Sequence, residues 1–155
     1  AAMKQLLIVA HAPSPNTKRL VEAALQGAQH EDIEGVKAQW IPPLEATPED
    51  VLAADGILLG TTENLAYMSG AMKDFFDRCY YPVLEEKQGL PCAIYIRAGH
   101  DGTGTHKALT SILTGLRWNL IQDILVCRGQ WQEAFLEQVE TLALTLAAGM
   151  DAGIY

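Results

Sequence analysis

The chain has 155 residues, of which 49% are hydrophobic, and this suits one domain with a sizeable core. Its formal net charge of −8 argues against a nucleic-acid-binding protein, which needs a basic face. No apolar run approaches the roughly 20 residues that cross a bilayer. The start of the chain lacks the features of a signal peptide, and Ala1 and Ala2 before Met3 look like residues added by cloning. We expect a cytoplasmic protein with a single domain over residues 1–155.

Apolar runs that are typical of strands alternate with amphipathic segments that are typical of helices. In chain order, the pattern predicts strand 5–10, helix 15–29, strand 36–41, helix 48–54, strand 56–61, helix 69–84, strand 91–97, helix 105–118, strand 121–127 and helix 131–148. The first strand, QLLIVA, is continuously apolar, as expected for a strand that is buried on both faces. Thr47 is the expected N-cap of the second helix, because Pro48 and acidic residues follow it.

This alternation predicts an α/β fold in which helices cover both faces of a parallel sheet. Five predicted strands fit a flavodoxin-like three-layer doubly wound sandwich with the strand order 2-1-3-4-5. In such a sheet a ligand binds beyond the carboxyl ends of the strands, beside the first strand. The loops 11–17, 61–69 and 98–105 are therefore expected to meet at one site.

The loop 11–17 places hydroxyl and amide side chains at the start of a helix. Free backbone N–H groups and the partial positive charge of the helix terminus make such a place suitable for a phosphate. Capping of the helix by Ser14 or Asn16 explains the same residues equally well, and one residue can do both. The loop contains neither a P-loop nor a GxGxxG pattern.

The other two loops are suited to a flat ring. The loop 98–105 has three glycines, which allow positive φ and close approach of the backbone to a ligand, although a plain mobile connection is the structural alternative. The loop 61–69 is long for a strand-to-helix connection, and this favours a role in binding.

The segment GTTENLAYMSGAMKDFFDR, residues 60–78, resembles the flavodoxin-like FMN proteins, and more closely their branch of NADPH-dependent FMN reductases and quinone oxidoreductases. The residues that match this branch are Gly60, Thr61, Met68, Ser69, Gly70, Met72, Lys73, Phe75, Asp77 and Arg78. The alternation of elements and the other two loops extend the resemblance over essentially the full chain. The resemblance implies an FMN-binding oxidoreductase that takes electrons from NAD(P)H and passes them to a quinone or a similar small acceptor.

The resemblance also implies the residues of the FMN site. The phosphate would lie among His11, Ser14, Asn16 and Thr17. The isoalloxazine would be bordered on one side by Thr61, Thr62, Glu63, Asn64, Leu65, Ala66 and Tyr67, and on the other by Ala98, Gly99, His100, Asp101, Gly102 and Gly104. No catalytic side chain is expected, because the cofactor carries the chemistry.

The segment after the third strand carries further implications. Ser69 would cap the following helix, and Lys73, Asp77 and Arg78 would be structural or interfacial. The resemblance implies a homodimer, for which Tyr67, Tyr80 and Tyr81 are the candidate interface residues.

Three departures from the branch keep other functions open. Thr62 stands in place of a proline, Glu63 brings a carboxylate to the loop beside the flavin, and the first loop contains two prolines. One alternative is a flavodoxin-type electron carrier, since carriers dock basic partners through acidic rims, although the phosphate loop of carriers is missing. The other is a flavodoxin-like domain that has lost flavin binding.

The cysteines lack the spacing of a metal site. Cys92 and Cys127 lie in predicted strands, and Cys79 lies on the apolar face of a helix. We expect three buried free thiols in a reducing compartment, and no metal.

Overall fold

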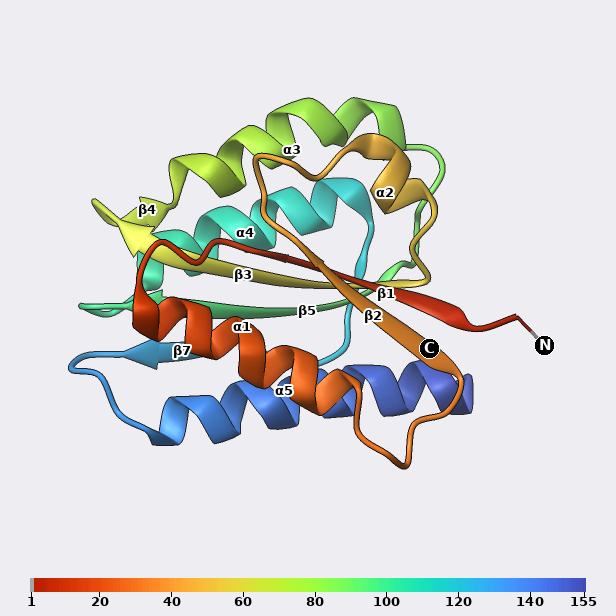
Figure 1. Ribbon diagram of the computed structural model, residues 1–155. Helices are drawn as coiled ribbons and strands as arrows, with labels where there is room; N and C mark the ends of the chain where they lie inside the picture. The colour runs from red at the N-terminus through yellow and green to blue at the C-terminus, as the bar shows by residue number, and fades with distance from the viewer. Residues whose placement is uncertain (1) are drawn as a thin grey trace.

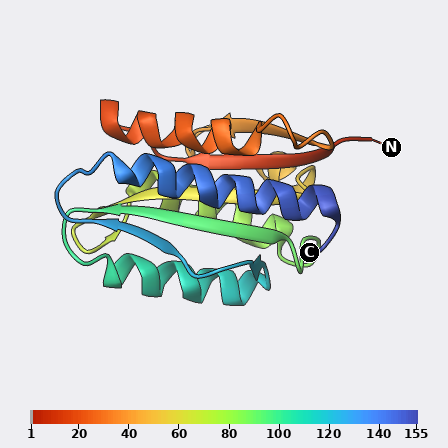
Figure 2. The same cartoon turned by 90° about the horizontal axis from the view of Figure 1, so that it is seen from below.

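The computed structural model describes residues 2–155, so Ala1 lies outside the described part of the chain. One sheet lies between two layers of helices, as Figures 1 and 2 show from two directions. One layer contains α2 (Pro48–Leu52), α3 (Gly70–Val83) and α4 (Thr103–Leu116), and the other contains α1 (Pro15–Ala28) and α5 (Ala134–Ala152). The α/β three-layer fold predicted from the sequence is confirmed.

The sheet has the order β2-β1-β3-β5-β6, with β4 beside β3 and β7 beside β5. The strands are β1 (Lys4–Ala10), β2 (Val36–Ile41), β3 (Gly56–Asn64), β4 (Tyr67–Met68), β5 (Pro91–Ala98), β6 (Asn119–Leu120) and β7 (Leu125–Arg128). All strand pairs are parallel except β3 with β4. This is the predicted order 2-1-3-4-5, with seven strands in place of five.

The prediction of one continuous strand over 121–127 was wrong. β6 pairs with the start of β5 and β7 with its end, and residues 121–124 leave the ladder between them. The polar pair Gln122 and Asp123 interrupts the apolar pattern there. The interruption is tolerated because this strand lies at the edge of the sheet and is paired on one side alone.

Both faces of the sheet are buried, which explains why the strands are continuously apolar. Along β1, Leu7 and Val9 enter the core under α2, α3 and α4, while Leu6 and Ile8 enter the core under α1 and α5. Each fully buried side chain of this size contributes about 1.5–3 kcal/mol relative to an exposed one. The three cysteines are buried and free, as expected. Within residues 2–155, no helix has the length and hydropathy needed to span a membrane.

The starts of three helices follow from side-chain caps. Ser14 begins α1 and Thr47 begins α2, each through a reciprocal pair of hydrogen bonds with the residue three positions later. Ser69 begins α3 by accepting the Met72 N–H at 3.1 Å, as the resemblance implied. Helix α4 starts two residues earlier than predicted, because Gly102 takes a left-handed conformation that lets the helix begin at Thr103.

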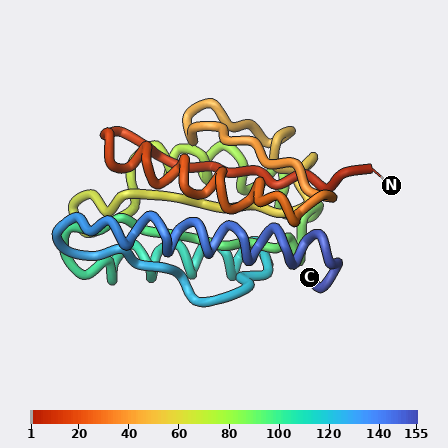
Figure 3. Tube along the Cα trace, turned by 60° about the horizontal axis from the view of Figure 1, so that its bottom comes forward, coloured from red at the N-terminus to blue at the C-terminus, as the bar shows by residue number. Residues whose placement is uncertain are grey.

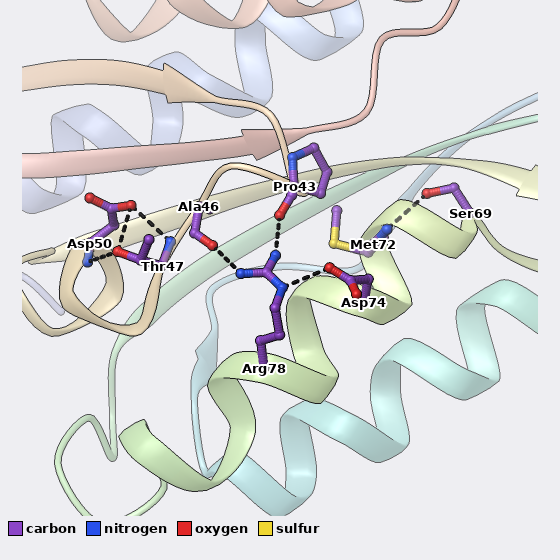
Figure 4. Close-up of polar contacts among 8 residues, drawn as sticks. All are labelled: Pro43, Ala46, Thr47, Asp50, Ser69, Met72, Asp74 and Arg78. Atoms are coloured by element: carbon purple, nitrogen blue, oxygen red, sulfur yellow. Dashed lines mark hydrogen bonds and ion pairs between the residues drawn. The ribbon is translucent and has the colours of Figure 1, made fainter.

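Arg78 fixes α3 to the loop that precedes α2 (Figure 4). Its guanidinium donates to the carbonyl of Ala46 at 2.7 Å, to the carbonyl of Pro43 at 2.6 Å and to the carboxylate of Asp74 at 2.7 Å. Arg78 is therefore structural, which is one of the two roles expected for it. Lys73 and Asp77 form an exposed ion pair of 2.6 Å on the same helix.

Candidate functional site

The loops that follow β1, β3 and β5 gather at one edge of the sheet. Figure 3 shows the start of α1, the turn after β3 and the loop after β5 together at the end of the molecule opposite both termini. The strands are parallel, so their carboxyl ends necessarily share this edge. The structure thus brings together the three segments in which all the predicted site residues lie.

The segment predicted as a loop over 61–69 is largely a β-hairpin, so that prediction was wrong. β3 continues to Asn64, the chain turns at Leu65 and Ala66, and β4 returns through Tyr67. Both turn residues have positive φ, 53° and 64°. A two-residue hairpin turn demands such angles, but residues with a Cβ adopt them at a cost of roughly 1–2 kcal/mol each. The segment carries no sequence signal for a hairpin, because the usual Asn-Gly pair is absent.

Contacts at both ends hold the hairpin. At its base, the Thr61 hydroxyl accepts the Ser69 N–H at 3.1 Å and donates to the Thr62 carbonyl at 2.9 Å. The Thr61 side chain is buried, so it faces the protein interior and the cap of α3. At the tip, the carbonyl of Ala66 occupies the space that a Cβ on Gly104 would need. The hairpin and the first turn of α4 are therefore in direct contact.

The first loop uses its hydroxyl groups internally. The Thr17 hydroxyl accepts the Ser14 N–H at 2.9 Å, and the Ser14 hydroxyl accepts the Thr17 N–H at 3.2 Å. The capping reading of Ser14 is therefore correct, and Thr17 completes the box. The first turn of α1 contains no acidic residue, so the partial positive charge at its start is not neutralised locally.

Few backbone donors remain in this loop. Pro13 and Pro15 have no N–H, and the N–H of His11 donates to Gly60 at 2.9 Å. This leaves the N–H groups of Ala12 and Asn16 to face a ligand. Partial burial of the His11 ring lowers its pKa.

In the loop after β5, residues 101–103 are held by a hydrogen bond, whereas residues 99 and 100 are exposed. Asp101 accepts the Thr103 N–H at 3.0 Å, and this hydrogen bond lowers the pKa of its carboxyl group. Gly102 is buried with a φ of 72°, whereas Gly99 faces open space and His100 is exposed. The loop thus presents backbone groups beside a free volume at the edge of the sheet.

These residues fit the FMN that the resemblance implies. The start of α1 offers a place for a phosphate, and the exposed hairpin residues 64–67 and the open side of Gly99 offer the borders of a flat ring. The buried hydroxyl of Thr105, in the first turn of α4, has no hydrogen-bond partner within residues 2–155. An unpartnered buried hydroxyl is costly, and Thr105 directly follows Gly104, where the hairpin touches α4.

The structure also brings to this edge a cluster that the sequence reading did not single out. Arg97 is the next-to-last residue of β5, and its guanidinium carbon lies 5.8 Å from the centre of the Trp131 ring. Arg19 lies 5.7 Å from the same ring and pairs with Glu133 at 2.6 Å. The one feature of the sequence that points to this cluster is Arg97, a charged residue near the end of an apolar strand.

Comparisons with known proteins place this chain in a family. The family described as NADPH-dependent FMN reductase matches residues 40–133, more than half of the chain. A flavodoxin of Aquifex aeolicus is 34% identical over 114 residues, which are 74% of this chain and 60% of that protein. The chain thus spans less than two thirds of the length of this curated relative.

Solved structures confirm the fold. A flavodoxin from the domain Archaea superposes with a TM-score of 0.76 at 18% identity, covering 93% of this chain and 96% of its own. The flavodoxin described as a WrbA-like protein from Agrobacterium tumefaciens gives a TM-score of 0.77 at 16% identity, covering 97% and 98%. Because the family model matches residues 40–133, the chain belongs to the NADPH-dependent FMN reductase family.

Proposed function

We propose that this protein is an NAD(P)H-dependent oxidoreductase that passes electrons through FMN to a quinone or a similar small acceptor. The observation that carries the proposal is the contact between Ala66 and Gly104, which joins the hairpin to the first turn of α4 at the edge of the sheet where α1 also starts. When bound, FMN supplies the redox chemistry by accepting a hydride from NAD(P)H and delivering electrons to the acceptor.

The chain's own residues have three tasks in this proposal. The N–H groups of Ala12 and Asn16, at the start of α1, bind the phosphate with the help of the helix dipole. The hairpin residues 64–67 and the loop residues 98–102 hold the ring by its edges, with His100 exposed where a ring could stack. The family's reaction requires no side-chain base, which agrees with the absence of paired carboxylates among the predicted site residues.

A flavodoxin-type electron carrier is the second candidate. The 34% identity with the Aquifex aeolicus flavodoxin and the net charge of −8 favour it, because acidic carriers dock basic partners. The two candidates differ in their expected reaction with NADPH. A reductase is reduced rapidly by NADPH alone, whereas a carrier needs a protein donor.

The acceptor site is proposed to be completed by a second copy of the chain. Tyr81 is 79% exposed on α3, and Tyr67 is 39% exposed on the hairpin that precedes this helix. A groove lined by Lys73, Phe76, Tyr80 and Ile112 continues this surface. If light scattering gives the molar mass of a single chain, the homodimer is refuted, while the proposal that the protein binds FMN is unaffected.

The decisive experiment is a fluorescence titration of the purified protein with FMN, followed by NADPH with and without a quinone. Saturable quenching at micromolar FMN and rapid bleaching of the flavin by NADPH are expected. Quenching without rapid bleaching would favour the carrier. A protein that quenches no FMN fluorescence would overturn both candidates.

A further inference from the structure

Arg97 is the one charged residue of β5, whose sequence is PCAIYIRA. Its side chain lies on the face of the sheet under α1 and α5, since Tyr95, two residues earlier, packs in that core. Its Nη1 donates to the carbonyls of Ala98 at 2.8 Å and of Cys127 at 3.1 Å. The guanidinium carbon also lies 5.1 Å from the centre of the Phe135 ring.

These contacts leave part of the guanidinium unused. The bonds of Nη1 tie the end of β5 to the end of β7, which is a structural role. Within residues 2–155, however, Nε and Nη2 of Arg97 make no hydrogen bond, and no carboxylate forms an ion pair with this residue. Arg19 and Arg78, by contrast, each have a carboxylate partner. The two carbonyls and the rings of Trp131 and Phe135 satisfy part of this half-buried cation, and an anion at Nε and Nη2 would complete it.

The position of Arg97 connects it to all three loops of the site. Thr62 in the hairpin is its partner on the neighbouring strand, and Ala98 follows it in the chain. The guanidinium carbons of Arg97 and Arg19 lie 5.8 and 5.7 Å from the centre of the same Trp131 ring, and Arg19 in turn donates to Asn16, in the first turn of α1, at 3.4 Å. Arg97 therefore stands at the carboxyl edge on the same face of the sheet as the start of α1.

The first loop, residues 11–17, has few backbone donors for a phosphate, and Arg97 could supply the missing ones. Pro13 and Pro15 remove two N–H donors, and the capping box of Ser14 and Thr17 engages two more. A phosphate at the start of α1 would therefore meet few backbone donors. A guanidinium with two free nitrogens is well suited to replace them, because it binds phosphate oxygens in a forked geometry.

We propose that Arg97 binds a phosphate monoester of the nucleotide in this site. Both FMN and the 2′-phosphate of NADPH carry this group, and the start of α1 favours FMN. The inference rests on the proposed function, because it assigns a residue to the same site. Arg97 would be a binding and specificity-determining residue that acts through its charge and its free edge.

The test compares ligands with and without the phosphate. FMN and riboflavin share the ring and differ in the phosphate, so the ratio of their dissociation constants reports phosphate binding alone. Arg97→Met keeps the apolar stem but removes the charge, and Arg97→Lys keeps the charge but loses the fork. We expect Arg97→Met to reduce the preference for FMN over riboflavin about tenfold or more, with Arg97→Lys intermediate and riboflavin affinity nearly unchanged.

The matched control is the double variant Arg19→Met with Glu133→Gln. It removes the other arginine from the same Trp131 ring together with its counter-charge, so the net charge is kept. The double variant is expected to keep the FMN preference of the native protein. A second arm compares the KM values for NADPH and NADH, which differ by a phosphate monoester.

The outcomes separate the inference from the proposed function. If Arg97→Met reduces only the preference for FMN over riboflavin, Arg97 binds the phosphate of FMN. If it reduces only the preference for NADPH over NADH, Arg97 binds the 2′-phosphate of NADPH. If Arg97→Met keeps both preferences of the native protein, the inference is overturned, while the proposal that the protein binds FMN stands. A native protein that binds neither FMN nor riboflavin would overturn the proposed function together with the inference.

Discussion

The carbonyl of Ala66 at the tip of the hairpin stands where a Cβ on Gly104 in α4 would be placed. Gly104 therefore lets two loops of the site touch, and it lies in a helix where alanine would otherwise be favoured by up to about 1 kcal/mol. Ala66 is also one of the two turn residues with positive φ, together with Leu65.

Gly104→Ala is expected to displace the hairpin. The collision with a backbone carbonyl outweighs the gain in helix propensity, and overpacking of this kind costs roughly 1–3 kcal/mol. Urea unfolding should show a lower free energy of unfolding, and FMN affinity should fall with it. Gly99→Ala is the control for stability alone, because Gly99 faces open space. Equal stabilities for the two variants would contradict the proposed contact.

Ser14→Ala should weaken the start of α1. The capping box is lost, and removal of an N-cap hydroxyl typically costs about 1 kcal/mol. Thermal and urea unfolding measure the change. Ser111, which is exposed in the middle of α4, supplies the control, since its replacement by alanine should be neutral or slightly stabilising. Similar losses for both serines would show that Ser14 does not act as a cap.

Arg78→Met should be among the more destabilising changes at a partly exposed position. Three charge-assisted hydrogen bonds are lost, two of them to the carbonyls of Pro43 and Ala46, so we expect a loss of about 2–3 kcal/mol. Lys73→Met, on the same helix, breaks an exposed ion pair and should change stability by about 0.5 kcal/mol or less. A comparable effect of the two variants would argue against the bridge drawn in Figure 4.

The ion pair of Arg19 and Glu133 predicts a pH dependence. The hydrogen bond from Arg19, and then that from Trp131, lowers the pKa of Glu133 from 4.5 to about 2. A carboxyl group with a lowered pKa in the folded state stabilises the protein above its unfolded pKa, and this stabilisation is lost as the pH falls. The difference in melting temperature between the native protein and Glu133→Gln should be constant above about pH 4.5 and vanish towards pH 2.

High salt provides the control for this pH dependence. The pair is exposed, so added salt should screen it and reduce the difference between the two proteins at every pH. A difference that persists unchanged down to pH 2 would mean that the charge of Glu133 is not responsible.

The sequence by itself determined the fold and the edge at which the site lies. Continuous apolar runs such as Leu6–Ala10 are buried on both faces, and this is the signature of a parallel sheet between helices. Caps such as Ser14 and Thr47 act within one turn of chain, so their residue types alone indicate where helices begin. The segment 60–78 gave the family.

Only the tertiary structure decided how the site is built. The hairpin 61–68 carries no turn signal of its own, and its turn packs against Gly104, almost forty residues further along the chain. The break at 121–124 depends on the strand's place at the sheet edge. The unpaired guanidinium of Arg97 beside Trp131 also arises from contacts between distant segments. Local patterns report what a residue does within its own element, whereas contacts across loops exist only once the chain has folded.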